Sequence, residues 1–96
     1  MYEIPPDLPG EYIRIATDDP DADFETAKDL AKQTARKRWT YPMILSWFDA
    51  TTGEGYPAFE CAGHEKPPWR VYAESRGADL SVIVNDGRYI FLFLTE

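Results

Sequence analysis

The chain has 96 residues, a length that fits one domain with one core. Hydrophobic residues make up 44% of it and aromatic residues 15%, which excludes a disordered segment. A formal net charge of −7 argues against binding to nucleic acid or to an anionic membrane, because both are negatively charged. A single cysteine, no basic and apolar leader, and no apolar run near the roughly 20 residues of a membrane span predict a soluble cytoplasmic protein without disulfides.

The first residues are rich in proline. Residues 1–10 therefore predict an extended N-terminal arm in front of a single domain over residues 11–96. Alternating apolar and polar side chains then predict a first strand over 11–17.

A helical period follows from about Pro20 to Arg38. Asp19 is expected to cap this helix and Pro20 to occupy its first position. Acids gather at its start and bases at its end, where the helix dipole favours them.

The rest of the chain reads as strands separated by turns and one further helix. Two prolines and a glycine bracket the second helix, and Asn85-Asp86-Gly87 is typical of a tight hairpin turn. The expected elements are a strand over 42–49, a turn over 51–55, a short edge strand over 56–61, a helix over 68–76, and strands over 79–84 and 88–94.

The order strand, helix, strand, strand, helix, strand, strand predicts an α+β domain. We expect two layers, with the long and the short helix on one face of a mixed, mostly antiparallel sheet, as in a ferredoxin-like variant. The segments 44–53 (ILSWFDATTG) and 66–93 (KPPWRVYAESRGADLSVIVNDGRYIFLF) resemble a family of small prokaryotic proteins catalogued only as a domain of unknown function. The resemblance implies an α+β domain of about this length and carries over no activity, cofactor or catalytic residue.

Cys61 and His64 are the one cysteine and the one histidine of the chain, and Glu60 and Glu65 lie beside them. A thiolate activated by His64 would be a nucleophile if the two side chains touch. Two copies of the pair could supply four ligands to a metal shared across a dimer. The plainer interpretation is that both residues are structural or incidental.

Alternating aspartates at positions 19, 21 and 23 have the spacing of a calcium loop. Pro20 and the lack of a closing glutamate at Leu30 break that pattern, so we expect the acids to decorate a helix start.

Lys28, Lys32 and Arg36 recur every four residues and mark one flank of the predicted helix, which Lys37 and Arg38 would extend. Residues 28–48 carry five bases and one acid inside an acidic chain. These cations form either a solvated helix face or a docking stripe for an acidic partner, a phosphorylated ligand or another copy's acidic N-terminal region.

Three aromatic residues near element ends, Trp39, Tyr56 and Trp69, are expected to be exposed and to contribute to a binding surface. The sequence thus favours a noncatalytic binding or protein-interaction module, with self-association or an acidic protein as partner. The alternative is a small thiol-dependent enzyme or metal-binding protein using Cys61 and His64. No phosphate loop, nucleophile elbow or paired metal-ligand motif is present, and no cofactor is predicted.

Overall fold

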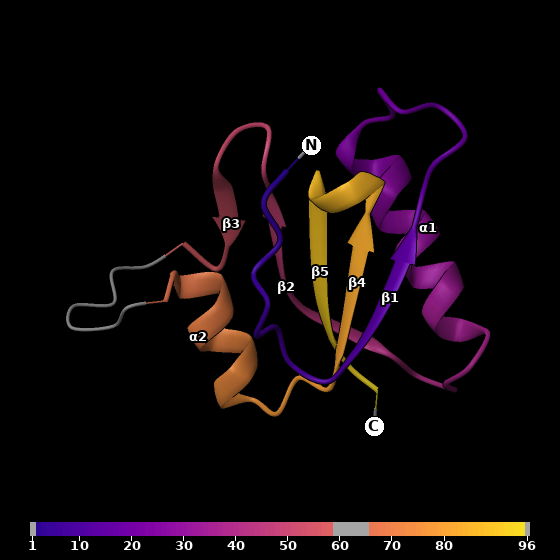
Figure 1. Cartoon of the computed structure of the whole chain (residues 1–96). Helices are drawn as coiled ribbons and strands as arrows, with labels where there is room; N and C mark the ends of the chain where they lie inside the picture. The colour runs from indigo at the N-terminus through magenta and orange to yellow at the C-terminus, as the bar shows by residue number, and fades with distance from the viewer. Residues whose placement is uncertain (1, 59–65, 96) are drawn as a thin grey trace.

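The computed structural model describes residues 2–58 and 66–95 of the chain, and Figure 1 traces them from end to end. In chain order these residues form β1 (Glu11–Ile15), α1 (Phe24–Arg36), β2 (Met43–Asp49), β3 (Glu54–Tyr56), α2 (Pro68–Ser75), β4 (Leu80–Val84), the 3-10 turn η1 (Asn85–Gly87) and β5 (Tyr89–Leu94). The expected order of strands and helices is confirmed.

The strands form one mixed sheet in the order β1-β4-β5-β2-β3. β1 runs parallel to β4, and the other neighbours pair antiparallel. The α+β class and the mostly antiparallel sheet are therefore confirmed. β4 and β5 lie at the centre, where every residue of β4 is buried.

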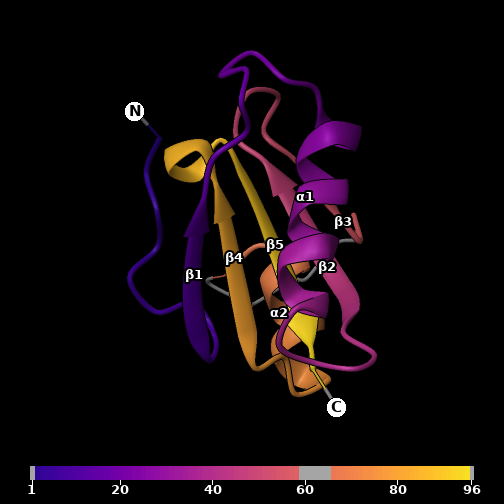
Figure 2. The same ribbon diagram turned by 90° about the vertical axis from the view of Figure 1, so that its right-hand side faces the viewer.

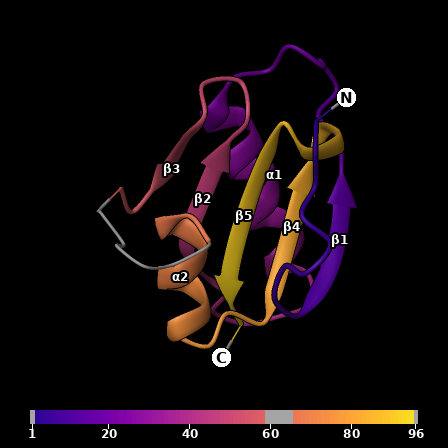
Figure 3. The same cartoon turned by 60° about the vertical axis from the view of Figure 1, so that its left-hand side comes forward.

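The two helices cover opposite faces of this sheet, so the expectation of two layers with both helices on one face is wrong. Ala27, Ala31 and Ala35 of α1 pack on one face, against Val82, Phe91 and their neighbours. Ala73 of α2 packs on the other face with Ile83 and Ile90. Figure 2 looks onto α1 with the sheet behind it, whereas in Figure 3 α2 lies in front of the sheet and α1 behind it. Both faces of β4 and β5 are apolar, and each face needs its own cover.

Residues 2–9 lie on the same face as α2. Figure 3 shows this N-terminal arm running beside β4 and β1. Its Leu8 is buried in the core of that face, and the Ser81 hydroxyl donates a hydrogen bond of 2.7 Å to the backbone oxygen of Pro9. The arm thus covers part of this face of the sheet that α2, with only eight residues, does not reach.

Helix α1 starts at Phe24, so the expected start at Pro20 with an Asp19 cap is wrong. Asp23 is the N-cap, and its carboxylate accepts a hydrogen bond of 2.9 Å from the backbone N–H of Thr26. Asp19 instead accepts one from the N–H of Asp21, which folds residues before the helix into a turn. The hydrogen bond from the Asp21 N–H to the Asp19 side chain therefore replaces the first helical turn that the sequence predicts.

Strand β3 spans Glu54–Tyr56, so the start expected at residue 56 is wrong by two residues, and Pro57 and Ala58 are not part of the strand. The rest of the expected strand, residues 59–61, lies outside the described part of the chain. Gly55 and Glu54 pair with β2, while Pro57, which has no N–H to donate, follows the last paired residue. Of the remaining expectations, the helix after Pro67 and the turn over 85–87 are confirmed.

Candidate functional site

A groove lies between one flank of α1 and the part of the sheet formed by β2 and β3. It has a volume of about 410 Å³ and combines basic, apolar and aromatic side chains. Its lining residues are Lys28, Lys32 and Arg36 of α1, Pro42 to Leu45 and Trp47 of the β2 segment, and Tyr56 of β3. The basic stripe predicted from the sequence and one of the three predicted aromatic residues therefore meet in one place.

The position of the basic stripe follows from the buried face of α1. Ala27, Ala31 and Ala35 are fully buried against the sheet. Each cation follows one of these alanines by a single residue, which on a helix means a rotation of about 100° away from the buried face. The stripe consequently lies at the flank of the helix rather than on its solvent side, and it faces the groove along nearly the whole of α1.

The floor of the groove is aromatic and partly open to solvent. Trp47 packs against the core on the α1 face, and Tyr56 is paired with it across the β2–β3 ladder. Their rings stack with centroids 6.3 Å apart and planes 17° from parallel. Tyr56 is 56% exposed, so its expected exposure is confirmed.

Three large apolar side chains of the described residues are exposed to solvent. They are Tyr41, Met43 and Tyr56, and two of them line the groove. The sequence gives no sign that Met43 is exposed, because the first residue of an apolar strand is expected to lie in the core. Exposed apolar groups beside a charged rim are typical of an interaction surface.

The three cations of the groove form no ion pair within residues 2–58 and 66–95. Arg38 behaves differently, since its guanidinium pairs with the Glu11 carboxylate and lies over the Trp39 ring, 4.5 Å from the centroid. This pairing, chiefly through hydrogen bonding, lowers the pKa of Glu11. Arg38 therefore does not line the groove, contrary to the expectation that it extends the stripe.

Among residues 2–58 and 66–95, no strand covers one edge of β2 along part of the groove. β3 covers only Trp47, Phe48 and Asp49 of β2. On the side of β3, no strand of the described chain pairs with residues 43–46, although β5 pairs with Met43, Ile44 and Ser46 on the other side. Leu45 is an extra residue in that ladder, which bends the strand where the groove begins.

Trp69 is 4% exposed, and its expected place on an open binding surface is wrong. Its ring stacks on Phe48 at 5.0 Å on the α2 face. Gly55 makes room for it, because a Cβ there would lie 2.6 Å from the Trp69 ring. Trp39 is half-buried against the α1-face core. An aromatic residue near the end of a helix can thus be buried where a neighbouring glycine leaves room for its ring.

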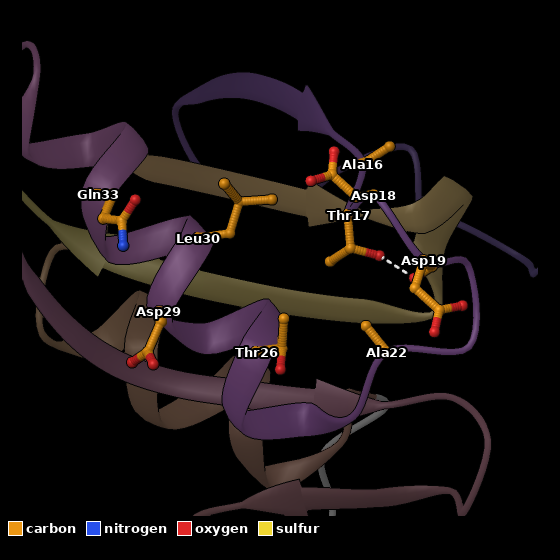
Figure 4. A pocket seen from close by; sticks show the side chains of 9 residues that line it. All are labelled: Ala16, Thr17, Asp18, Asp19, Ala22, Thr26, Asp29, Leu30 and Gln33. Atoms are coloured by element: carbon orange, nitrogen blue, oxygen red, sulfur yellow. Dashed lines mark hydrogen bonds between the residues drawn. The ribbon is translucent and has the colours of Figure 1, made fainter.

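A second hollow of about 390 Å³ lies between the segment after β1 and α1. Figure 4 shows that the carboxylates of Asp18, Asp19 and Asp29 lie apart along it and do not converge. In the described part of the chain, no group of three or more His, Cys, Asp or Glu residues is placed to hold a metal ion. The aspartates at 19 and 23 instead bond to backbone N–H groups, as expected for acids before a helix.

Cys61 and His64 lie outside the described residues, so the hypotheses of a reactive thiol and of a shared metal site remain untested predictions. Within the described ranges, no helix is long and apolar enough to cross a membrane.

The structure defines a small α+β protein with a five-stranded mixed sheet. The chain belongs to the family described as domain of unknown function DUF5619, whose model matches residues 10–93. It is 37% identical over 73 residues to an uncharacterized protein of Archaeoglobus fulgidus, covering 76% of this chain and 77% of that one. The crystal structure of AF1514, a protein from Archaeoglobus fulgidus DSM 4304, is similar to it with a TM-score of 0.76 and 33% identity, over 91% of this chain and 95% of that one. The family resemblance inferred from the sequence is confirmed.

Proposed function

We propose that this protein is a noncatalytic binding module whose contact surface is the groove between α1 and β2–β3. One observation carries the proposal: three cations without an ion pair among the described residues border the same groove as the exposed Met43 and Tyr56. A ligand that fits must be anionic on the side of the helix and apolar on the side of the sheet.

Repulsion among the cations of the stripe is offset only in part by Glu25 and Asp29, which lie three residues before Lys28 and Lys32. Like charges four residues apart repel one another and destabilise a helix by about 0.2–0.5 kcal/mol per pair. Lys28, Lys32 and Arg36 make two such pairs in succession. An anionic partner would remove this repulsion. Since the whole chain carries a net charge of −7, only a local concentration of bases can attract such a partner.

The proposal is tested by titrating the isotope-labelled protein with poly-L-glutamate at low salt and following the backbone amide resonances. We expect shifts concentrated in residues 28–36, 43–47 and 56, and weaker binding as the salt concentration rises. The double variant Lys32→Glu, Arg36→Glu should lose these shifts.

Arg14 provides the matched control. It lies on β1, at the opposite edge of the sheet, and it forms no ion pair within the described residues. Binding by Arg14→Glu should equal that of the wild type. Shifts centred on Arg76 or Arg88, or an undiminished response of the double variant, would refute the groove as the contact surface.

A further inference from the structure

We infer that the occupant of the groove is an extended acidic segment of a partner protein, which adds to the sheet as a strand beside β2 and carries a carboxylate at every second residue. This inference rests on the proposed function and specifies its ligand. Three features support it: the edge of β2 that no described strand covers, the spacing of the cations, and the hydrogen bonds that the chain's own aspartates already make.

The open edge of β2 offers backbone hydrogen bonds to an incoming strand. On the side of β3, the described residues leave 43–46 without a partner strand, because β3 ends at Tyr56 and the following Pro57 cannot donate. The N–H and C=O groups that point outward along such an edge pair readily with an extended segment. A segment in this position would continue the line of β3 and would lie in the groove.

The spacing of the cations matches the side-chain repeat of a strand. Four residues of α-helix advance about 6 Å along the axis, and two residues of a strand advance about 6.7 Å. Lys28, Lys32 and Arg36 can therefore each meet one of three successive side chains on one face of an added strand. The intervening side chains would point to the opposite face, away from the cations. The cations would therefore favour acidic residues only at alternate positions of the added strand.

The chain's own acidic segment is a poor occupant, which favours a partner protein over a second copy. Residues 18–23 carry alternate aspartates, but Asp19 holds a turn and Asp23 caps α1. Extending this segment would break both interactions. A different chain, whose acidic residues make no such hydrogen bonds, would bind with a smaller loss of free energy.

The test uses two nine-residue peptides of identical composition, built from glutamate, threonine and valine. The first has glutamate at positions 3, 5 and 7, and the second has its three glutamates adjacent at positions 4 to 6. Calorimetry at low salt should show at least tenfold tighter binding of the alternating peptide. Hydrogen exchange at the outward-facing amides of residues 43–46 should slow when that peptide binds.

Backbone pairing is tested by N-methylation of the alternating peptide. Successive N–H groups of a strand point to opposite edges, so methyl groups at positions 3 and 5 and at positions 4 and 6 block different edges. One methylated peptide should lose binding, and the other should bind as the parent does. Equal effects of the two methylation patterns, or equal affinity of the two glutamate spacings, would overturn the inference.

Failure of this inference can be separated from failure of the proposed function. If poly-L-glutamate shifts the groove resonances and Lys32→Glu, Arg36→Glu abolishes the response, the binding surface is supported. Strand addition alone is then overturned by equal binding of the two peptides. Association of the unliganded protein that the same double variant removes would instead make a second copy the occupant and would likewise overturn the choice of partner.

Discussion

The guanidinium of Arg70 contacts Asp7 twice: its Nη2 forms an ion pair with the carboxylate at 2.9 Å and donates a hydrogen bond of 3.0 Å to the backbone oxygen. Arg70 is buried at the start of α2 and Asp7 belongs to the N-terminal arm. The arm is therefore attached to the helix with which it shares a face of the sheet. Lys66 adds a longer contact, with its Nζ 3.8 Å from the Asp7 carboxylate.

Attachment of the arm should depend on pH. The hydrogen bond from Arg70 lowers the pKa of Asp7 below its ordinary value of 3.8. A carboxyl group with a lowered folded-state pKa stabilises the fold fully above its unfolded pKa, and the contribution disappears as the pH falls through the folded pKa. We expect Asp7→Asn to be less stable than the wild type at pH 6 and equally stable once the pH is below the folded pKa of Asp7. Urea unfolding over this range measures the difference, and Asp18→Asn serves as the control. A difference that persists unchanged in acid would contradict the prediction.

Gly10→Ala should be much more destabilising than Gly77→Ala. Both glycines have positive φ, which costs an L-residue about 1–2 kcal/mol. A Cβ at Gly10 would also lie 1.9 Å from the backbone oxygen of Asp79, whereas nothing lies within 4 Å of one at Gly77. We expect a loss of at least about 3 kcal/mol for Gly10→Ala and about 1–2 kcal/mol for Gly77→Ala in denaturant unfolding. Equal losses would mean that the arm shifts freely at this point.

Asp23→Ala should cost about 1 kcal/mol of unfolding free energy, because the side chain is the N-cap of α1. The pKa of Asp23 is lowered, with the hydrogen bond from the Thr26 backbone as the largest cause. Asp21 lies just before the cap, and within the described residues its carboxylate accepts no hydrogen bond. Asp21→Ala is therefore the control and should change stability by less than half as much. A larger loss for Asp21→Ala would move the helix start back towards Pro20.

Ala31→Leu should destabilise the protein by about 1–3 kcal/mol through overpacking. Ala31 is fully buried between α1 and the sheet, so the added atoms would push the helix away from Phe91 and its neighbours. Gln33→Leu, on the exposed side of the same helix, should have little effect. Thermal unfolding of the two variants measures the contrast, and equal melting temperatures would show that the helix can move outward without cost.

Sequence periodicity identified the order of the elements because each carries its own local signal. The alternation in β4, the apolar run of β5 and the Asn85-Asp86-Gly87 turn all depend on neighbouring residues. Which face each helix covers depends instead on contacts between distant segments, and no local pattern records them. The apolar character of both faces of β2 and β5 was a signal for two covering layers that the two-layer expectation did not use.

The candidate site was predictable only in part for the same reason. A period of four marks Lys28, Lys32 and Arg36 from the sequence alone, but their meeting with Tyr56 depends on the order of the strands. Trp69 shows the opposite error, since its burial depends on the missing side chain of Gly55. Helix starts also resist prediction where several aspartates compete as caps, as Asp19 and Asp23 do here.

The parallel pairing of β1 with β4 joins residues about 70 positions apart, whereas β4 and β5 form a local hairpin. A ribosome delivers β1 well before β4, so β1 has no partner strand among the described residues until β4 has been synthesised. We expect the hairpin to form quickly once it emerges and β1 to dock on it afterwards. The slowest step in folding this domain would then be the docking of β1 on β4, a strand that lies far from it in the sequence.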